Sequence, residues 1–135
     1  MENKHNLFNR QDEKELFPQL DYLGVSLTPY QALAGGRLSR KSGEVTARSI
    51  TQDAGTKKYT DESDEEISKR VEELAEKHGC SKADIVLAYE LSKKPVASVI
   101  VGTSSPQRLE DTVKCLDVHL SDEDVRYLEE PYLPR

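Results

Sequence analysis

The sequence contains no tryptophan, one methionine and two cysteines among its 135 residues. Hydrophobic residues make up only 36% of the chain, and charged residues make up 33%. A chain of this size buries about two thirds of its unfolded surface at best. So few apolar residues leave a small margin of burial over the entropy of the chain. The composition therefore predicts marginal stability and suggests an incomplete domain.

The chain also lacks long apolar runs and clusters of basic residues. Apolar runs such as residues 99–101 are too short to span a bilayer, and residues 1–6 lack the apolar core of a signal peptide. The net charge is −6, whereas nucleic acids and anionic membranes favour clustered Lys and Arg. Cys80 and Cys115 do not make a disulfide framework. We therefore expect a cytoplasmic protein with neither nucleic acid nor membrane as a partner.

Apolar residues recur at helical spacing in several segments bounded by turn signals. The first helix is predicted over residues 11–23, before Gly24, and Pro18 is expected to kink or shorten it. Later helices are predicted after capping serines, which are Ser63, Ser81, Ser105 and Ser121. They are expected to end at Gly79, at Pro95, at about Cys115 and near Pro131.

Two segments are predicted as strands. Residues 24–28 form a short strand ending at Pro29, and the β-branched residues 96–101 are typical of a strand buried on both faces. Residues from about 35 to 62 lose the apolar signal, as in a long functional or disordered loop. Strands separated by helices indicate a parallel α/β architecture. Two strands cannot form a barrel or a stable sheet alone, so further strands are expected upstream.

The first candidate site follows the predicted strand over 24–28. In parallel α/β folds, ligands bind at the carboxyl ends of strands. Tyr30 offers a flat ring there, and Gly35 and Gly36 leave the backbone N–H groups accessible. These features suit a planar heterocycle and a phosphate. A tyrosine that merely packs on a glycine-rich turn is the alternative.

The second candidate site follows the predicted strand over 96–101. A hydroxyl-rich turn at a helix N-terminus attracts anions, because unpaired N–H groups and the helix dipole favour negative charge. Arg108 is an unusual cation in the first turn of such a helix, and a bound phosphate would explain its placement. Plain helix capping beside a solvated arginine is the alternative.

Two other kinds of site fit the sequence less well. Residues 74–91, with Gly79 in the turn, have the lengths of a helix-turn-helix, but Asp84 and Glu90 give the second helix the wrong sign for DNA. His78 and Cys80 are close in sequence, yet the other histidines do not have metal-ligand spacing. Neither DNA binding nor a metal site is predicted.

Four segments resemble aldo-keto reductases in the same order along the chain. Residues 27–38 (LTPYQALAGGRL) resemble the segment after barrel strand seven, and residues 100–111 (IVGTSSPQRLED) resemble the phosphate motif of strand eight. Residues 6–10 (NLFNR) and 120–124 (LSDED) are similar to the stretch after strand six and to the final helix. The colinear match makes the resemblance specific. It implies an α/β fold that is the C-terminal part of a (β/α)₈ TIM barrel, an incomplete barrel, over residues 1–135.

The resemblance implies that the chain contacts NADP at both candidate sites. Tyr30 would stack on the nicotinamide ring, and Lys41 would reach the phosphates. The pyrophosphate path would be lined by Gln31, Ala32, Leu33, Ala34 and Gly35. The adenosine 2′-phosphate would be held by Gly102, Thr103, Ser104 and Arg108, and the adenine would lie by Asp111 and Thr112. Arg48, in the long loop, is a further phosphate candidate, and Glu2 stands where the family usually has a glutamine.

The family reduces aldehydes and ketones to alcohols with NADP(H), using a catalytic Asp, Tyr, Lys and His on its first four strands. No residue of this chain matches that tetrad, and general acid catalysis alone is worth roughly 10²–10⁴-fold. We therefore expect a partial aldo-keto reductase that acts on a small carbonyl or alcohol substrate only if an N-terminal half completes it. The chain alone is expected to bind NADP weakly or not at all. A catalytically inactive truncated fragment and a non-enzymatic cofactor-binding or regulatory chain are the alternatives.

Overall fold

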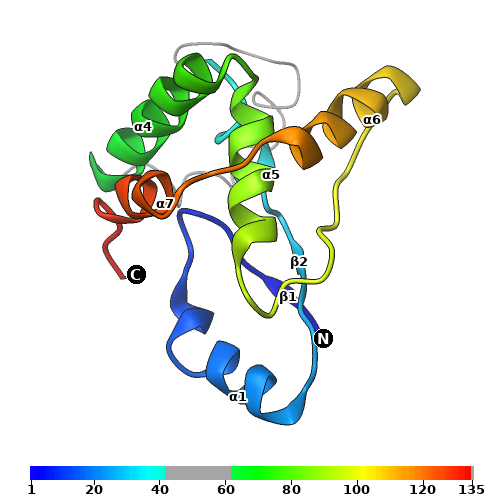
Figure 1. Cartoon of the computed structure of the whole chain (residues 1–135), viewed down its shortest axis with the longest axis vertical. Helices are drawn as coiled ribbons and strands as arrows, with labels where there is room; N and C mark the ends of the chain where they lie inside the picture. Colours follow the sequence, from blue (N-terminus) through cyan, green and yellow to red (C-terminus); the bar gives the residue numbers. More distant parts are fainter. Residues whose placement is uncertain (42–61, 135) are drawn as a thin grey trace.

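The computed structural model describes residues 1–41 and 62–134, and helices predominate in it (Figure 1). The first part contains β1 (Glu2–Lys4), the 3-10 helix η1 (Gln11–Glu13), α1 (Leu16–Leu23), β2 (Thr28–Tyr30) and the 3-10 helix η2 (Ala34–Gly36). The second part contains α4 (Glu62–His78), α5 (Lys82–Ser92), α6 (Pro106–Val113), the 3-10 helix η3 (Lys114–Asp117) and α7 (Asp122–Glu129). No helix in these two ranges is long and apolar enough to cross a membrane.

The sheet consists of β1 and β2, which pair in parallel with Glu2 opposite Thr28. Strand β1 was not predicted, because three residues are too few to show a strand periodicity. The predicted strand over 24–28 is wrong in its bounds, since β2 starts at Thr28 and includes Pro29. Pro29 is compatible with β2 because Thr28, not Pro29, donates its N–H towards β1, to the carbonyl of Met1 at 2.8 Å.

The predicted strand over 96–101 is wrong as well. Leu27 forms an isolated parallel bridge with Val96, donating to the Pro95 carbonyl at 2.6 Å and accepting from the Ala97 N–H at 3.0 Å. The next donor on this side of β2 would be Pro29, which has no N–H. The ladder therefore stops, and residues 97–101 run alongside β2 without forming a strand.

The expected burial of this segment on both faces is also wrong. Val99 and Val101 pack against a cluster that contains Leu87, but Ile100 is 42% exposed. One face of the segment therefore packs on the helices and the other is open.

The helices follow the predictions more closely. Pro18 lies in the first turn of α1, which is shortened as expected and ends at Gly24 in the left-handed conformation, with φ 67°. The side chains of Ser81, Ser105 and Ser121 accept hydrogen bonds from the first turns of α5, α6 and α7. The predicted Ser63 cap is wrong, because α4 already begins at Glu62.

The main core lies where α4 packs on α5 and α7. Every residue of α5 from 84 to 90 is buried, and the helix runs through the middle of the molecule between α4 and η3 (Figure 1). Ile67 and Val71 of α4 meet Ile85 of α5 and Leu128 of α7 in this core. In contrast, α6 buries none of its side chains.

Candidate functional site

Both candidate turns follow extended segments that run parallel to each other. The parallel bridge between Leu27 and Val96, and the hydrogen bond of 3.0 Å from the Ile100 N–H to the Pro29 carbonyl, align the two preceding segments. The chain then continues from β2 into the turn at residues 30–36, and from Val101 into the turn at residues 102–105. In Figure 1 the β2 segment and the segment before α6 run in the same direction.

The turn after β2 has an unusual backbone. Gln31 and Ala34 have positive φ angles of 55° and 51°, and Gly35 and Gly36 follow with 67° and 94°. A left-handed conformation costs a residue with a side chain roughly 1–2 kcal/mol, and such outliers cluster at ligand sites. The turn is therefore held in a shape that its local sequence does not favour.

The side chains of this turn divide between the core and solvent. Tyr30 is 37% exposed, whereas Ala32 and Ala34 are buried and Leu33 is half-buried. The Ala34 N–H donates to the Gln31 carbonyl at 2.9 Å, and the Gly36 N–H donates to the Leu33 carbonyl at 2.9 Å. Two of the turn's N–H groups are thus used internally, while the Tyr30 ring reaches the surface.

The turn before α6 is shaped by hydroxyl groups. Ser105 accepts from the Arg108 N–H at 3.2 Å. Thr103 Oγ1 donates to the Ser105 carbonyl at 2.9 Å and accepts from the Ser105 N–H at 3.3 Å. Gly102 and Ser104 are exposed. Two of the expected hydroxyls therefore build the turn itself.

Arg108 is exposed on the first turn of α6. Among residues 1–41 and 62–134, its guanidinium has no hydrogen-bond or ion-pair partner, although its N–H and carbonyl are both bonded. A cation in the first turn meets the positive end of the helix dipole. An exposed guanidinium in this position is available to an anion.

Two other predicted site residues lie further along α6. Asp111 accepts from Lys114 at 3.1 Å and from Gln107 at 3.3 Å, and these hydrogen bonds lower the pKa of the Asp111 carboxyl. Thr112 Oγ1 donates to the Arg108 carbonyl at 2.7 Å. Both side chains are therefore bonded within their own helix and η3.

The remaining predicted phosphate ligands lie beside or within residues 42–61, which are outside the described residues. Lys41 is exposed at the end of the first range that the structure describes. Arg48 lies outside the described residues.

A buried charge cluster was missed by the sequence analysis. His5 Nδ1 lies 2.7 Å from Glu90 Oε2, and His5 Nε2 lies 3.0 Å from Glu13 Oε1. Burial disfavours the imidazolium, but the hydrogen bonds to Glu13 and Glu90 outweigh it and raise the pKa of His5 to about 9. Burial also raises the pKa of the Glu90 carboxyl. The histidine is therefore a cation held between two carboxyl groups.

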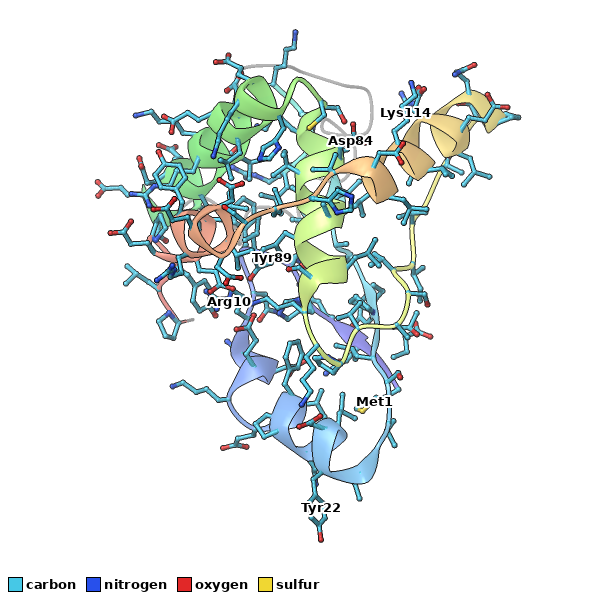
Figure 2. The ribbon with its side chains drawn as sticks, in the orientation of Figure 1. Met1, Arg10, Tyr22, Asp84, Tyr89 and Lys114 are labelled. Carbon is cyan, nitrogen blue, oxygen red and sulfur yellow. The ribbon has the colours of Figure 1, made fainter. Side chains whose placement is uncertain are left out.

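The same cluster extends to α7. Arg10 donates to Glu13 at 2.7 Å and lies 3.3 Å from Glu129, which also accepts from Lys93 and from the Tyr89 hydroxyl at 2.9 Å. Figure 2 shows Arg10 and Tyr89 on the side of α5 that faces α7. No local pattern in the sequence marks this cluster, because its members come from four separate segments.

These features indicate the fold class of the chain. Parallel extended segments, helices between them and candidate ligand turns at their carboxyl ends are parts of a (β/α)₈ barrel. A crystal structure of a thermostable aldo-keto reductase with the inhibitor epalrestat superposes with a TM-score of 0.69 at 21% identity, over 96% of this chain and 38% of that one. The fold is therefore the C-terminal part of such a barrel, and the barrel is incomplete.

The chain belongs to the Aldo/keto reductase family, whose model matches residues 1–132. It is 39% identical to versiconal hemiacetal acetate reductase of Aspergillus parasiticus, over 100% of this chain and 40% of that protein. It is 40% identical to a putative aryl-alcohol dehydrogenase of Schizosaccharomyces pombe, over 99% of this chain and 38% of that protein. The chain thus spans about two fifths of the length of these relatives. Members of the family are oxidoreductases that generally use a nicotinamide cofactor.

Proposed function

We propose that this chain is the cofactor-binding portion of an NADP(H)-dependent aldo-keto reductase. The observation that carries the proposal is the Arg108 guanidinium, which has no partner among the described residues and lies beside the Ser105 cap of α6. The segment before this turn runs parallel to β2, whose last residue is the exposed Tyr30. An extended dinucleotide with an additional phosphate on its adenosine ribose has the matching chemistry: a flat ring at one end and a dianion at the other.

Each part of NADP would then meet a different group of residues. Tyr30 would stack on the nicotinamide, and Arg108 would pair with the 2′-phosphate beside the N–H groups and hydroxyls of the turn at 102–105. Gln31 to Gly35, with Lys41, would follow the pyrophosphate, and Asp111 and Thr112 would lie by the adenine. When bound, NADPH would supply the hydride that reduces a carbonyl carbon.

Open surfaces support the proposal that further barrel elements complete the site. Leu109 and Val113 of α6 and Leu116 of η3 are all close to half exposed or more. In the described part of the chain, β1 has β2 as its only strand neighbour. Apolar side chains at helical spacing and an unpaired strand edge are surfaces that folded proteins normally cover. We propose an N-terminal half barrel as the partner, with the catalytic tetrad on it.

The proposal is tested by restoring a whole barrel. The chain would be fused behind the N-terminal three fifths of the Aspergillus parasiticus relative, and NADPH oxidation would be followed with a panel of aldehydes and ketones. We expect the fusion to be active and this chain and the N-terminal portion to be inactive when assayed separately. A well-folded fusion that neither binds NADPH nor turns over would refute the proposal. It would favour the alternatives, an inactive fragment or a chain with a regulatory role.

A further inference from the structure

Asn6 connects the end of β1 to the turn that follows β2. Its side chain is completely buried, and its Nδ2 donates to the Gln31 carbonyl at 2.9 Å. Its Oδ1 accepts from the Phe8 N–H at 2.9 Å. Because the Phe8 N–H requires an acceptor, this bond also fixes which end of the Asn6 amide faces Gln31.

Asn6 is itself held rigidly. Its backbone N–H donates to the Asn9 carbonyl at 3.2 Å, and its carbonyl accepts from the Asn9 N–H at 2.9 Å. The two residues between them, Leu7 and Phe8, are buried in the main core. The Asn6 amide is therefore a fixed point from which a hydrogen bond can hold a neighbouring segment.

The segment that it holds is the one with the unfavourable backbone. The Gln31 carbonyl accepts from both Asn6 Nδ2 and the Ala34 N–H, each at 2.9 Å, so both of its lone pairs are used. Two bonds to one carbonyl fix the plane of the peptide that joins Gln31 to Ala32. In a planar trans peptide the Ala32 N–H is antiparallel to that carbonyl, so its direction is fixed too.

We propose that Asn6 is a positioning residue that keeps Gln31 left-handed and thereby sets the shape of the turn at 31–35. The part of this inference that concerns a ligand rests on the proposed function, in which this turn follows the pyrophosphate of NADP. The side chain at position 6 must supply a hydrogen-bond donor and an acceptor from one short planar group, and asparagine does so. Leucine has neither group, and serine is too short to reach Gln31 while still accepting from Phe8.

The first test needs no ligand. In the full-length chain, NMR scalar couplings and chemical shifts that report φ would be measured for Gln31 and Ala34. The variants are Asn6→Ala and Asn6→Ser, and the serine hydroxyl preserves the local bond to the Phe8 N–H. We expect both variants to lose the positive φ at Gln31 while circular dichroism shows the helices intact. Asn9→Ala, in the same tight turn, is the matched control and should leave Gln31 unchanged.

The second test separates the two turns with two ligands. In the proposed function NADP⁺ would extend over both turns, whereas 2′,5′-ADP would contact only the turn before α6. NMR titration detects even millimolar affinity. We expect Asn6→Ser to weaken the binding of NADP⁺ roughly tenfold, the size of one lost positioning bond. The binding of 2′,5′-ADP should be unchanged. Adding Gln31→Gly should restore the positive φ at position 31, because glycine adopts positive φ without cost.

The outcomes separate the two proposals. A positive φ at Gln31 that persists in both Asn6 variants overturns the positioning role, whatever the ligands do. Equal weakening of NADP⁺ and 2′,5′-ADP overturns it as well, because that pattern is a general loss of structure. If the unsubstituted chain, as well as the fusion described above, binds neither ligand, the proposed function fails, and the φ measurement still decides the role of Asn6.

Discussion

His5 and Glu90 are 85 positions apart in the sequence, and their side chains meet with 2.7 Å between Nδ1 and Oε2. Neither side chain is exposed. The contact joins the end of β1 to the last turns of α5, and Glu13 accepts the other imidazole nitrogen at 3.0 Å. A buried imidazolium stabilises the fold only while both carboxylate partners compensate for its desolvation.

Because of this contact, we expect the chain to lose stability as the pH becomes alkaline. The pKa of His5 is raised from 6.5 to about 9, so its contribution is complete below pH 6.5 and is lost as the pH rises through about 9. We expect the free energy of unfolding to fall by on the order of 3 kcal/mol across that range. Urea denaturation at a series of pH values measures it.

The matched variants are His5→Gln and His119→Gln, since His119 is exposed. His5→Gln should be less stable at pH 6.5 and should remove most of the alkaline dependence, whereas His119→Gln should behave like the unsubstituted chain. An unchanged pH dependence in His5→Gln would show that another group titrates.

Asp124 should make the stability of the chain fall in acid. Its carboxylate accepts from Lys77 at 2.8 Å and from His78 at 2.9 Å, and it completes the capping box of α7 with Ser121. Burial opposes ionisation, but these hydrogen bonds outweigh it and lower the pKa of Asp124 from 3.8 to about 2. The stabilisation is present above pH 3.8 and is lost as the pH falls through about 2.

We expect Asp124→Asn to lower the free energy of unfolding at neutral pH by about 1–3 kcal/mol. Thermal denaturation at neutral pH and in acid would measure the difference. Asp122→Asn, at an exposed position of the same helix turn, is the control and should change stability by less than about 0.5 kcal/mol. Equal effects of the two substitutions would assign the loss to the helix dipole instead of the Lys77 and His78 contacts.

Arg108 should determine whether the adenosine phosphate is recognised. Arg108→Gln removes a charge-assisted contact and should weaken the binding of 2′,5′-ADP by roughly 10- to 100-fold. The binding of 5′-AMP should be nearly unaffected. Lys114→Gln is the control, because Lys114 is a nearby exposed cation paired with Asp111 at 3.1 Å. The measurement is NMR titration of each variant. A similar loss for both nucleotides would exclude a specific contact to the 2′-phosphate.

Two helix caps of the same chemistry should differ in their effect on stability. Ser81 caps α5, which is buried in the core, whereas Ser105 caps α6, which buries none of its side chains. Ser81→Ala should lower the global free energy of unfolding by about 1 kcal/mol. Ser105→Ala should leave the global value unchanged and reduce only the amide protection of α6. Hydrogen exchange measured by NMR distinguishes global from local opening, and a global loss in Ser105→Ala would contradict the prediction.

Much of the helical structure could be predicted because its signals are local. A serine three residues before an aspartate at a helix start forms a capping box within a single turn of chain, as at Ser81 and Asp84. Gly24 ends α1 in the left-handed conformation that favours glycine. These effects act within one turn of chain, so the sequence alone expresses them.

The candidate site could be predicted only in part. The residues of the two turns, their order along the chain and the family could be predicted from the sequence. The left-handed conformation of Gln31 was not, because it depends on an amide 25 positions away. Whether these residues bind NADP stays a prediction.

The sequence by itself determined where most helices begin and end, the α/β fold class and the membership of the Aldo/keto reductase family. The tertiary structure alone decided that residues 97–101 do not form a strand, since the missing N–H of Pro29 interrupts a ladder between distant segments. It alone also decided that His5 is buried against Glu90 and that Asn6 holds Gln31. The physical reason is the same in each case. Capping and periodicity are interactions between near neighbours in the chain, whereas these contacts exist only after folding brings distant residues together.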